Sequence, residues 1–457
     1  MKKQKKVVIM LLLILLISIL VENKVFALNK EELTKSVEYT ENFKNYLELS
    51  EEERKKVLMP NPYEIKKTTT QTKNILKMAR MLGTGITESR YSLKDVIPEN
   101  VVVRNQKATN TCWAFASLAS LESTLALQNY KAQISAKTYD FSERHMNYSA
   151  SREFANNQIN IYGYNKALNE GGNWYMAKSY LTNGNGAINE TDMPFESNSN
   201  TINISEIQNK QVVSRVYDTI EFPSYSITED TTEIKQKIKE HIKNNGAVFA
   251  AIHGAKLTSN YCNIVTGAIY CDNKNDCKID HAVAIIGWDD DYGIDKFNEN
   301  HRPQNKGAWI IKNSWGNKLE YGTIETVRQE VFNIYKDQLA EKGITEASQI
   351  TNEEMNQLIA ILGWTIEGDK VYIPIGDNGI MYISYEDVNV YSGLSGIQKA
   401  SDSVDYVNIY QYDELSATGQ LESSISKIYM ANIFSKKTTG SEYLTRSRNK
   451  CTWKLYV

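Results

Sequence analysis

The stretch Gln106-Lys-Ala-Thr-Asn-Thr-Cys112-Trp-Ala-Phe-Ala-Ser-Leu118 decides the fold, because it places a cysteine where a helix begins. From Cys112 onward, apolar residues recur at steps of three and four, which is typical of a helix with one buried face. These residues are Phe115, Leu118, Leu121 and Leu125. Asn110 or Thr111 can cap the helix, because a short polar side chain accepts from its free N–H groups. We therefore predict a helix that starts at Cys112.

The position of Cys112 gives its thiol a chemical role. The positive end of a helix dipole favours thiolate, which is the nucleophilic form of cysteine. Gln106, six residues upstream, carries an amide that can donate to an oxyanion at the same place. This is the arrangement of an activated nucleophile beside half an oxyanion hole. The alternative is that Cys112 is a small core residue, as a lone cysteine on an apolar helix usually is.

Two later stretches place a histidine next to an asparagine. Asp280-His281-Ala-Val-Ala-Ile-Ile-Gly-Trp288 and Gly307-Ala-Trp-Ile-Ile-Lys-Asn313-Ser-Trp-Gly316 read as strands joined by the polar loop 289–306. If they pair antiparallel, the start of the first lies opposite the end of the second. An amide beside the imidazole would then fix its orientation. The alternative is that His281 is a structural residue that starts a strand.

The other histidines do not show this pattern. His253 follows another strand and His301 lies in the polar loop, so neither has an asparagine partner of this kind. We expect His145 and His241 on solvated faces of their helices. A different motif, Gly171-Gly172, precedes a predicted helix. A glycine pair is usually a turn, but it also lets a peptide backbone approach closely and bind in an extended form.

Together these motifs, in this order, resemble those of the papain family of cysteine peptidases over roughly residues 91–390. The resemblance implies an α+β, papain-like two-lobed fold, with a helical lobe and an antiparallel β lobe. It implies that Cys112 is the nucleophile and His281 the general acid and base. It further implies that Asn313 orients the imidazole and that Gln106 donates to the oxyanion.

The same resemblance assigns substrate binding and a reactive ion pair. Gly171, Gly172 and Trp315 would contribute to the substrate cleft, and Trp315 would also shield the histidine–asparagine hydrogen bond from water. The thiolate and imidazolium would form an ion pair across the cleft. One departure concerns a disulfide: papain has cysteines three before the nucleophile and two before the first glycine. This chain has Thr109 and Asn169 there, so we expect packing to hold the lobe.

The N-terminal region shows the features of export. Residues 1–27 combine a basic start, an apolar run over 7–20 and small residues before a cleavage site after Ala27, which predicts a signal peptide. A retained anchor is the alternative. Residues 28–90 are polar and charged, and we interpret them as a pro-segment, the alternative being a solvated helical arm. Met59-Pro-Asn-Pro62 suits an extended passage through the cleft.

Composition limits the other functions. The 457 residues carry 52 basic and 55 acidic side chains, a net charge of −3 that gives no indication of nucleic-acid binding. Of five cysteines, Cys271 and Cys277 lie close enough to bridge, whereas Cys262 and Cys451 stay unassigned. A cysteine metal site is the less favoured reading. Asp289–Asp291 with Asp295 could bind Ca²⁺, but a solvated acidic turn is favoured. We expect no cofactor and no metal.

The C-terminal half departs from the papain pattern twice. An insertion over about 317–375 contains a capping box, Thr351 to Glu354, that predicts a helix. We interpret this insertion as surface decoration; the alternative is a cover over one end of the cleft. Residues 391–457 are aromatic and strand-like, and they resemble the start of the lectin-like domain in some exported clostridial peptidases. Their length favours a partial, all-β lectin-like fragment.

Two hypotheses of function follow. The first is an exported cysteine endopeptidase made as a zymogen; the second is a non-catalytic surface adhesin on a peptidase-like scaffold. The expected partners are protein or peptide substrates, its own pro-segment as inhibitor, and cell-wall or S-layer components. The expected location is extracellular, with cell-wall association in a Gram-positive bacterium. We expect no integral membrane segment after signal removal.

Overall fold

The computed structural model describes residues 39–54, 57–60, 62, 86–154, 159–160, 163–195, 204–257, 259–402, 443–446 and 453–456. The predicted signal peptide and Cys451 lie outside the described residues, as do much of 28–90 and most of 403–457. In the part of the chain that is described, no helix has the length and apolar character needed to cross a bilayer.

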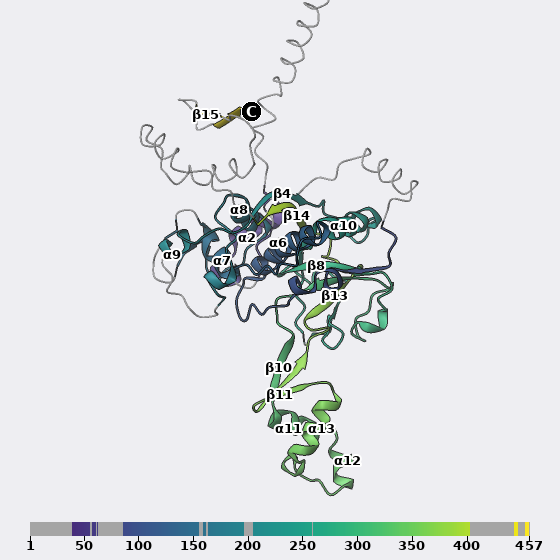
Figure 1. The fold of residues 1–457 in the computed structure, drawn as a ribbon. Coiled ribbons are helices and arrows are strands. Elements are labelled where there is room, and N and C mark those ends of the chain that lie inside the picture. The colour runs from purple at the N-terminus through teal and green to yellow at the C-terminus, as the bar shows by residue number, and fades with distance from the viewer. Residues whose placement is uncertain are drawn as a thin grey trace, which may run out of the picture.

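A largely antiparallel sheet forms the β lobe (Figure 1). Its strands run in the order β4-β14-β5-β8-β9-β13-β7-β6, and β1 pairs with β8 off this path. Their bounds are β1 Arg90–Ser92, β4 Arg215–Glu221, β5 Val248–Ile252, β6 Cys262–Asn263, β7 Ala268–Ile269, β8 His281–Asp289, β9 Ala308–Lys312, β13 Ile380–Ser384 and β14 Leu394–Ser401. The central strand β8 is buried along nearly its whole length, as its almost continuous apolar sequence requires.

The helical lobe is built around α6, Cys112–Lys131. Around it lie α5 Leu93–Val96, α7 Glu143–Ala150, α8 Trp174–Thr182, α9 Ile204–Gln208 and α10 Thr232–Asn245, with short parallel strands β2 Ser151–Glu153 and β3 Tyr164–Ala167. The prediction of one buried face is too narrow, because α6 is buried on every side from Cys112 to Leu127. Contacts with β8, α7, α8 and α10 surround it. The helix tolerates this because Ser117, Ser123 and Thr124 donate to carbonyls of its preceding turn.

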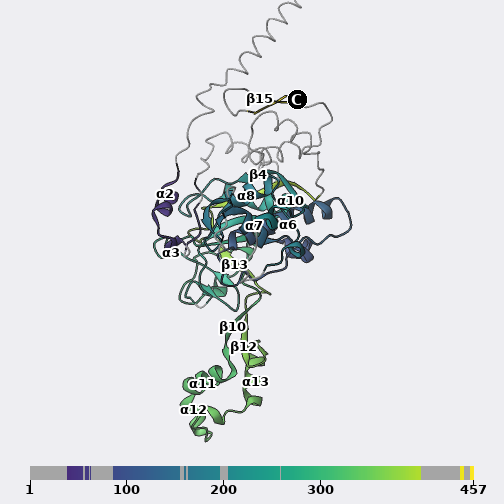
Figure 2. The ribbon, with the colours of Figure 1, turned by 90° about the vertical axis from the view of Figure 1, so that its left-hand side faces the viewer.

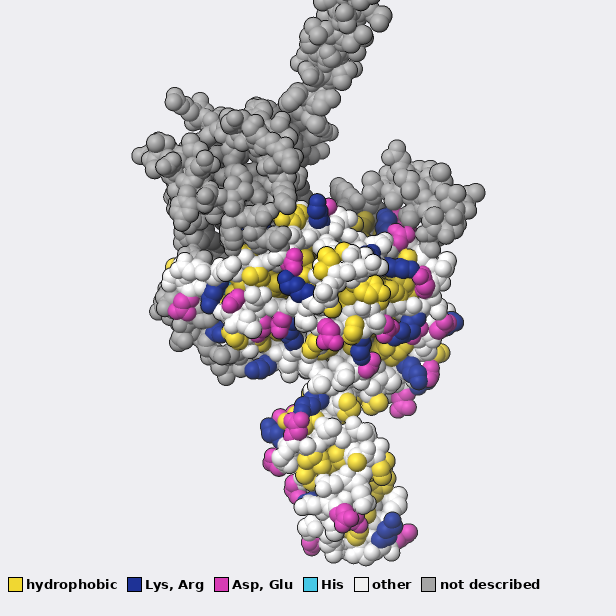
Figure 3. Space-filling view, in the orientation of Figure 1, with side chains coloured by type: hydrophobic (Ala, Val, Ile, Leu, Met, Phe, Trp, Pro, Cys, Tyr) yellow, Lys and Arg dark blue, Asp and Glu magenta, His cyan; other side chains and the backbone are white. Residues whose placement is uncertain are grey.

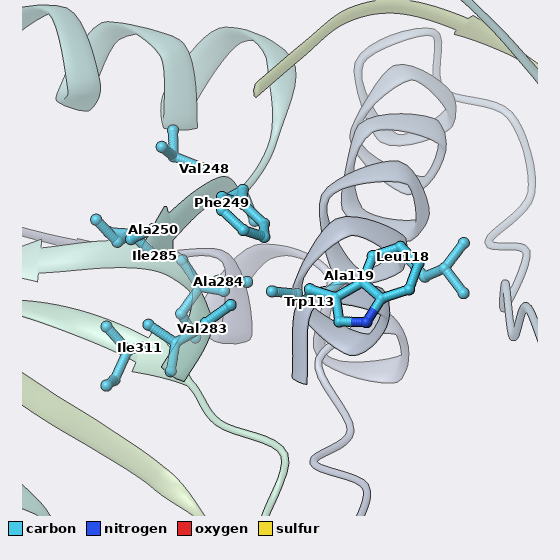
Figure 4. Close-up of a cluster of buried hydrophobic side chains, with 14 of the residues drawn as sticks. Trp113, Leu118, Ala119, Val248, Phe249, Ala250, Val283, Ala284, Ile285 and Ile311 are labelled. Carbon is cyan, nitrogen blue, oxygen red and sulfur yellow. The ribbon is translucent and has the colours of Figure 1, made fainter. Parts of the chain in front are cut away.

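The main hydrophobic core lies between α6 and the sheet. Figure 4 shows the first turns of α6, with Trp113 and Leu118, beside Phe249 of β5 and Ala284 of β8; the Leu118 side chain lies on the side of the helix away from the sheet. These side chains are fully buried. At about 25 cal/mol per Å² of apolar surface removed from water, such burial is the dominant force joining the two lobes. The core therefore fixes the start of α6 against the start of β8.

Two histidines differ from expectation. His145 and His241 are both buried rather than solvated. Tyr180 of α8 and the carbonyl of Ile207 bond the two ring nitrogens of His145. The ring of His241 packs against Phe222. Both helices are covered by neighbouring elements that their own sequences do not reveal.

The insertion forms a separate lobe that projects from the body, as Figures 1 and 2 show. It comprises β10 Lys318–Thr323, α11 Ile324–Ile334, α12 Lys336–Glu341, α13 Asn352–Ile361, β11 Thr365–Glu367 and β12 Lys370–Pro374. A hydrophobic cluster of its own includes Phe332, Met355 and Val371. The predicted helix is confirmed, with a complete capping box from Thr351 to Glu354. On the face shown in Figure 3, acidic, basic and hydrophobic side chains are interspersed over the body and this lobe.

The N-terminal segment packs on the body. Its helices are α2 Glu41–Glu48 and α3 Glu51–Arg54, and α2 lies along the side of the body in Figure 2. Tyr46, Leu58 and Met59 are buried in the main hydrophobic cluster. The Thr40 N–H donates to the Pro62 carbonyl at 2.9 Å, which closes the segment into a loop.

The main sheet continues beyond residue 390. β14 lies between β4 and β5, so residues 394–401 belong to the β lobe. The sequence change near Tyr391 does not mark the end of this sheet, because β14 follows it and pairs with β4 and β5. Further on, β15 Tyr443–Arg446 and β16 Trp453–Tyr456 form an antiparallel pair. A lectin-like identity for this part stays a prediction.

Candidate active site

Antiparallel pairing of β8 with β9 brings His281 to Asn313. The register pairs Ala284 with Lys312, so the start of β8 lies opposite the end of β9. His281 Nε2 lies 2.7 Å from Asn313 Oδ1. Because an amide oxygen only accepts, Nε2 carries a proton and Nδ1 of the neutral ring is left as an acceptor. The predicted neighbour relation between the two residues is thus present in the structure.

Asn313 and the imidazole are held by further contacts. Asn313 Oδ1 also accepts from the Ser314 N–H at 2.7 Å, and Nδ2 lies 3.2 Å from the sulfur of Met381. Trp315 stacks on the His281 ring with centroids 4.6 Å apart and an angle of 27°. The indole therefore covers one face of the imidazole, and the shielding of the His281–Asn313 hydrogen bond that the resemblance implies stays a prediction.

Cys112 lies at the first turn of α6, against the same strand. Its thiol is close to the backbone N–H of Ala282, the residue after His281. Burial raises the pKa of Cys112 to about 12, although the N–H groups of Ala282 and Trp113 oppose this shift. Burial also lowers the pKa of His281, and the hydrogen bond with Asn313 opposes it. Both shifts disfavour the charged forms, a direction opposite to that of the predicted ion pair, and the ion pair itself stays a prediction.

The reason for this difference is the depth of the site. Cys112 is 4% exposed and His281 is 5% exposed, and desolvation disfavours either charged form.

The start of α6 lacks the predicted side-chain cap. Thr111 occupies the N-cap position, but its hydroxyl does not accept from the helix N–H groups. Its hydroxyl lies 2.6 Å from that of Thr109 instead.

Gln106 connects the loop before α6 to the residues after β9. Its Oε1 accepts from the Ser314 hydroxyl at 2.6 Å, and its backbone N–H donates to the Ser314 carbonyl at 2.7 Å. The side-chain Nε2 donates one hydrogen to the Thr109 carbonyl at 2.6 Å. An amide nitrogen has a second hydrogen, so one donor of Gln106 remains for another acceptor. The orientation of the Gln106 side chain is therefore set by Thr109, in the loop before Cys112, and by Ser314, next to Asn313.

The glycine pair lies between the nucleophile helix and the N-terminal segment. A side chain at Gly172 would meet the Trp113 indole at 2.4 Å, so glycine is required for this contact. At Gly171 a Cβ would lie 3.2 Å from the Val57 carbonyl oxygen. Asn173, the N-cap of α8, donates to the Pro60 carbonyl at 3.1 Å. Residues 57–60 therefore pass along the glycine pair.

A cavity of about 840 Å³ adjoins this contact. Leu58 and Met59 line it from the N-terminal segment, while Phe249, Ala251 and Ile279 line it from the β lobe. Ala251 pairs with Ala282 in the sheet, next to His281. The cavity and residues 57–60 thus share the space beside the candidate site.

Hydrogen bonds connect the two loops that a disulfide joins in papain. Asn110 Nδ2 donates to the Asn169 carbonyl at 2.6 Å, which joins the two loops that carry Thr109 and Gly171. Beneath them, Lys166 is buried and donates to Asn147 Oδ1, Ser151 Oγ and the Ala167 carbonyl. The sequence predicted packing here and did not reveal Lys166, because a lone lysine in a polar stretch looks solvated.

A buried ion cluster supports the other side of the site. Arg104 contacts Glu122 at 3.0 Å and Glu143 at 2.8 Å. Lys312, directly before Asn313, lies 3.4 Å from Glu122. Burial raises the pKa of Glu143 to about 8, and Arg104 opposes this shift. These residues lie far apart in the sequence, and no local motif signals their cluster.

Two further expectations concern cysteines and metals. The predicted Cys271–Cys277 disulfide is present, and Cys112 and Cys262 are free thiols among the described residues. In the acidic turn, Asp290 and Asp291 are paired with Lys239 and Lys306. Within the described ranges, no group of three or more histidine, cysteine or acidic residues is arranged to hold a metal. The solvated-turn interpretation fits these ion pairs better than a calcium site.

Comparisons with known proteins extend this description. The model of the papain family of cysteine proteases matches residues 94–337, more than half of the chain. A viral cathepsin of Epiphyas postvittana nucleopolyhedrovirus is 27% identical over 214 residues, which is 47% of this chain and 51% of the relative. A cysteine protease of Blomia tropicalis is 24% identical over 217 residues, or 47% and 53%. The chain spans about half the length of the curated relatives it matches.

A solved structure is similar in fold. The cysteine protease and lectin-like domains of Cwp84, a surface layer associated protein of Clostridium difficile, superpose with a TM-score of 0.52. The identity is 23%, over 81% of this chain and 62% of the other. The predicted α+β, two-lobed fold of the papain type is therefore confirmed.

Proposed function

Because the chain belongs to the papain family of cysteine proteases, we propose that it is an exported cysteine endopeptidase that cleaves proteins or peptides. Cys112, His281 and Asn313 form its catalytic site, with Gln106 as oxyanion donor. The observation that carries this proposal is the 2.7 Å contact between His281 Nε2 and Asn313 Oδ1. It leaves Nδ1 as a base, beside a strand residue whose N–H contacts the Cys112 thiol.

The reaction uses each of these groups once. The thiol proton passes to His281 Nδ1 as the sulfur attacks the peptide carbonyl, which converts the neutral pair into the ion pair during the reaction. The Cys112 backbone N–H and the second hydrogen of Gln106 Nε2 hold the oxyanion. His281 then protonates the leaving amine and activates the water that releases the acyl group. Asn313 keeps the imidazole in this orientation throughout.

The N-terminal segment acts as an inhibitor in this proposal. Residues 57–60 contact Gly171 and Asn173, and glycines at such a position let an extended peptide backbone approach closely. Leu58 and Met59 are buried there. A substrate that needs the glycine pair would compete with this segment, so residues 28–90 must move or be cut before turnover. Gly171, Gly172 and Trp315 then border the substrate.

Export follows from the basic and apolar pattern of residues 1–27. The substrates are accordingly extracellular proteins or peptides. Wall association, S-layer partners and a lectin-like fragment after β14 rest on sequence resemblance and enter the proposal only as secondary features.

The test of the activity is turnover of a peptide library by the matured chain. We expect cleavage, and we expect Cys112→Ala to abolish it with an unchanged circular dichroism spectrum. Cys262→Ala, which removes the other free and buried thiol of the described residues, is the matched control and should cleave normally. A matured wild-type chain that binds proteins or surfaces but cleaves no peptide would instead favour the non-catalytic adhesin.

The test of the zymogen uses residues 28–457. We expect weak activity that rises with time, together with a new N-terminus between Thr68 and Tyr91 by N-terminal sequencing. A chain that is fully active from the start and stays uncut would show that this segment is a structural arm.

A further inference from the structure

The loop after β5 packs against the base of His281. Strand pairing sets Ile252 opposite His281, so His253 and Gly254 follow directly from the partner of the candidate catalytic residue. A Cβ built at Gly254 would lie 2.6 Å from His281 Cβ and 3.0 Å from Cγ. Trp315 covers the ring itself. The backbone of Gly254 therefore packs directly against the His281 side chain, with no room for a larger residue.

Asp280 joins this loop to the strand that carries His281. Its Oδ1 accepts from the Gly254 N–H at 2.6 Å and lies 3.6 Å from His253 Nδ1. His253 Nδ1 also lies 3.0 Å from the Lys278 carbonyl. Because a carbonyl only accepts, Nδ1 keeps its proton in both charge states of the ring. Protonation of His253 at Nε2 then adds a charge without breaking this hydrogen bond.

We propose that His253 is a positioning residue of the Cys112–His281 site, which holds Asp280 and the 253–255 loop against His281 and offsets the charge of Asp280. The inference rests on the proposed function for its effect on turnover. The contact itself does not depend on that function.

The charged neighbours of His253 make the direction of the effect definite. Asp280 faces it from the start of β8, Asp387 from the turn after β13, and Tyr261 from the loop before β6. The nearby carboxylate of Asp280 raises the pKa of His253. The negative charge of Asp280 raises the pKa of His281, whereas the positive charge of His253 lowers it. Since the net pKa of His281 is lowered, His253 is charged in the range where His281 titrates.

The direct experiment measures the pKa of His281. Chains with Cys112→Ala avoid self-cleavage, and histidine-selective NMR follows each imidazole with pH. His253→Asn keeps an N–H donor toward the Lys278 carbonyl but removes the charge. We expect it to raise the pKa of His281 by about half a unit or more, as loss of a nearby like charge does. An unchanged or lower pKa in a folded variant would overturn the proposal.

His301→Asn is the matched control. His301 also packs on Tyr261, with centroids 4.7 Å apart, and pairs with an aspartate, Asp272, at 2.8 Å. It makes no contact of this kind with Asp280, so its replacement should leave the pKa of His281 unchanged. A shift equal to that of His253→Asn would mean that any loss in this histidine–tyrosine cluster acts on His281, and the specific role would be wrong.

A second variant separates charge from structure. Asp280→Asn should lower the pKa of His281, and adding His253→Asn to it should produce a smaller rise than in the wild-type background. Equal rises in both backgrounds would contradict an effect that offsets Asp280.

The activity arm uses the matured enzyme. His253→Asn should move the acidic limb of kcat/KM to higher pH, because His281 acts as a base only when its ring is neutral, whereas His253→Ala should also lower kcat because it releases the Lys278 carbonyl. A merely structural role would lower the rate without moving the limb, and would overturn the proposal. If wild-type turnover is absent while the NMR shift occurs, the proposed function fails and the role of His253 in positioning Asp280 stands.

Discussion

The two lobes of the site are held by different kinds of interaction. In the β lobe, pairing of β5, β8 and β9 fixes His281 and Asn313, and the Cys271–Cys277 disulfide closes the loop that leads toward Asp280. In the helical lobe, the glycine pair rests on the Asn110–Asn169 hydrogen bond and on Lys166. The first lobe is fixed by covalent and repeated backbone bonds, whereas the second depends on a few polar side chains.

This difference makes the helical lobe the sensitive one. Burial lowers the pKa of Lys166 to about 7, and Glu170 opposes the shift. Ladder hydrogen bonds and a disulfide do not titrate near neutral pH, but a buried amine does. We therefore predict that substitutions and pH change the stability of the helical lobe more than that of the β lobe, whereas the chemistry depends on His281 and Asn313 of the β lobe.

The largest expected effect tests the chemical half of the comparison. His281→Ala should lower kcat about 100- to 10,000-fold, the usual contribution of a general acid and base. Asn313→Ala should leave more activity, because Asn313 orients the ring and transfers no proton. Steady-state kinetics on one peptide measures both. If His253→Ala were inactive while His281→Ala kept its rate, the assignment from strand pairing would be wrong.

A new disulfide should give the helical lobe a covalent link like the one that the β lobe already has. Thr109→Cys with Asn169→Cys restores the cysteine positions of papain on the loops that Asn110 now joins. A bridge there should add about 2–4 kcal/mol to the free energy of unfolding, measured by denaturant titration with and without reductant. Failure of the two thiols to pair under mild oxidation would show that the hydrogen-bonded loops do not replace the missing disulfide in space.

Loss of the buried Lys166 amine should lower the stability of the helical lobe. Lys166→Met leaves Asn147 Oδ1 and Ser151 Oγ without this donor, at a cost of about 1–3 kcal/mol, and should raise KM more than it lowers kcat. Lys178→Met, at a half-exposed lysine paired with Glu221, is the control for loss of a lysine charge. A free energy of unfolding equal to that of the wild type would show that Lys166 does not stabilise the helical lobe.

The same residue predicts a pH dependence. Its pKa is about 7 in the folded chain and near 10.5 unfolded, so the unfolded chain binds more protons between these values. Stability from this residue therefore rises as pH increases from about 7 toward 10.5. The wild type should gain relative to Lys166→Met over this window in denaturant titrations. A constant or falling difference would contradict a lowered pKa of Lys166 in the folded chain.

The smallest effect concerns the insertion. Replacing residues 318–374 by a short turn should change kcat/KM for a small peptide by less than about threefold, because surface elements with their own packing tolerate deletion. The lobe has its own hydrophobic cluster and projects from the body (Figure 2). A loss of more than tenfold would show that the insertion belongs to the β lobe's support of Asn313.

The sequence predicted what local patterns and strand pairing encode. The start of α6 at Cys112, the His281–Asn313 contact, the Cys271–Cys277 bridge and the capped helix after Thr351 were all predictable, since each follows from spacing or from elementary geometry. The burial of His145 and His241 was not, because it depends on which distant elements cover their helices.

The remaining differences have the same physical cause. Lys166 and the Arg104–Glu122 cluster join residues that no motif connects. Burial raises the pKa of the Cys112 thiol, whereas the sequence shows only the helix dipole that would lower it. The place of β14 in the main sheet depends on partners in β4 and β5 that lie far upstream.

Selective alkylation tests the central claim most directly, because the chain contains its own control. Cys112 and Cys262 are both free and buried, and burial raises the pKa of each to about 12. Only Cys112 lies beside Ala282 and the His281–Asn313 pair. In matured enzyme with Cys451→Ser, an epoxysuccinyl peptide reagent followed by peptide mass mapping should modify Cys112 alone, and His281→Ala should prevent it. Equal labelling of Cys262, or labelling of Cys112 that survives His281→Ala, would contradict a catalytic site at Cys112.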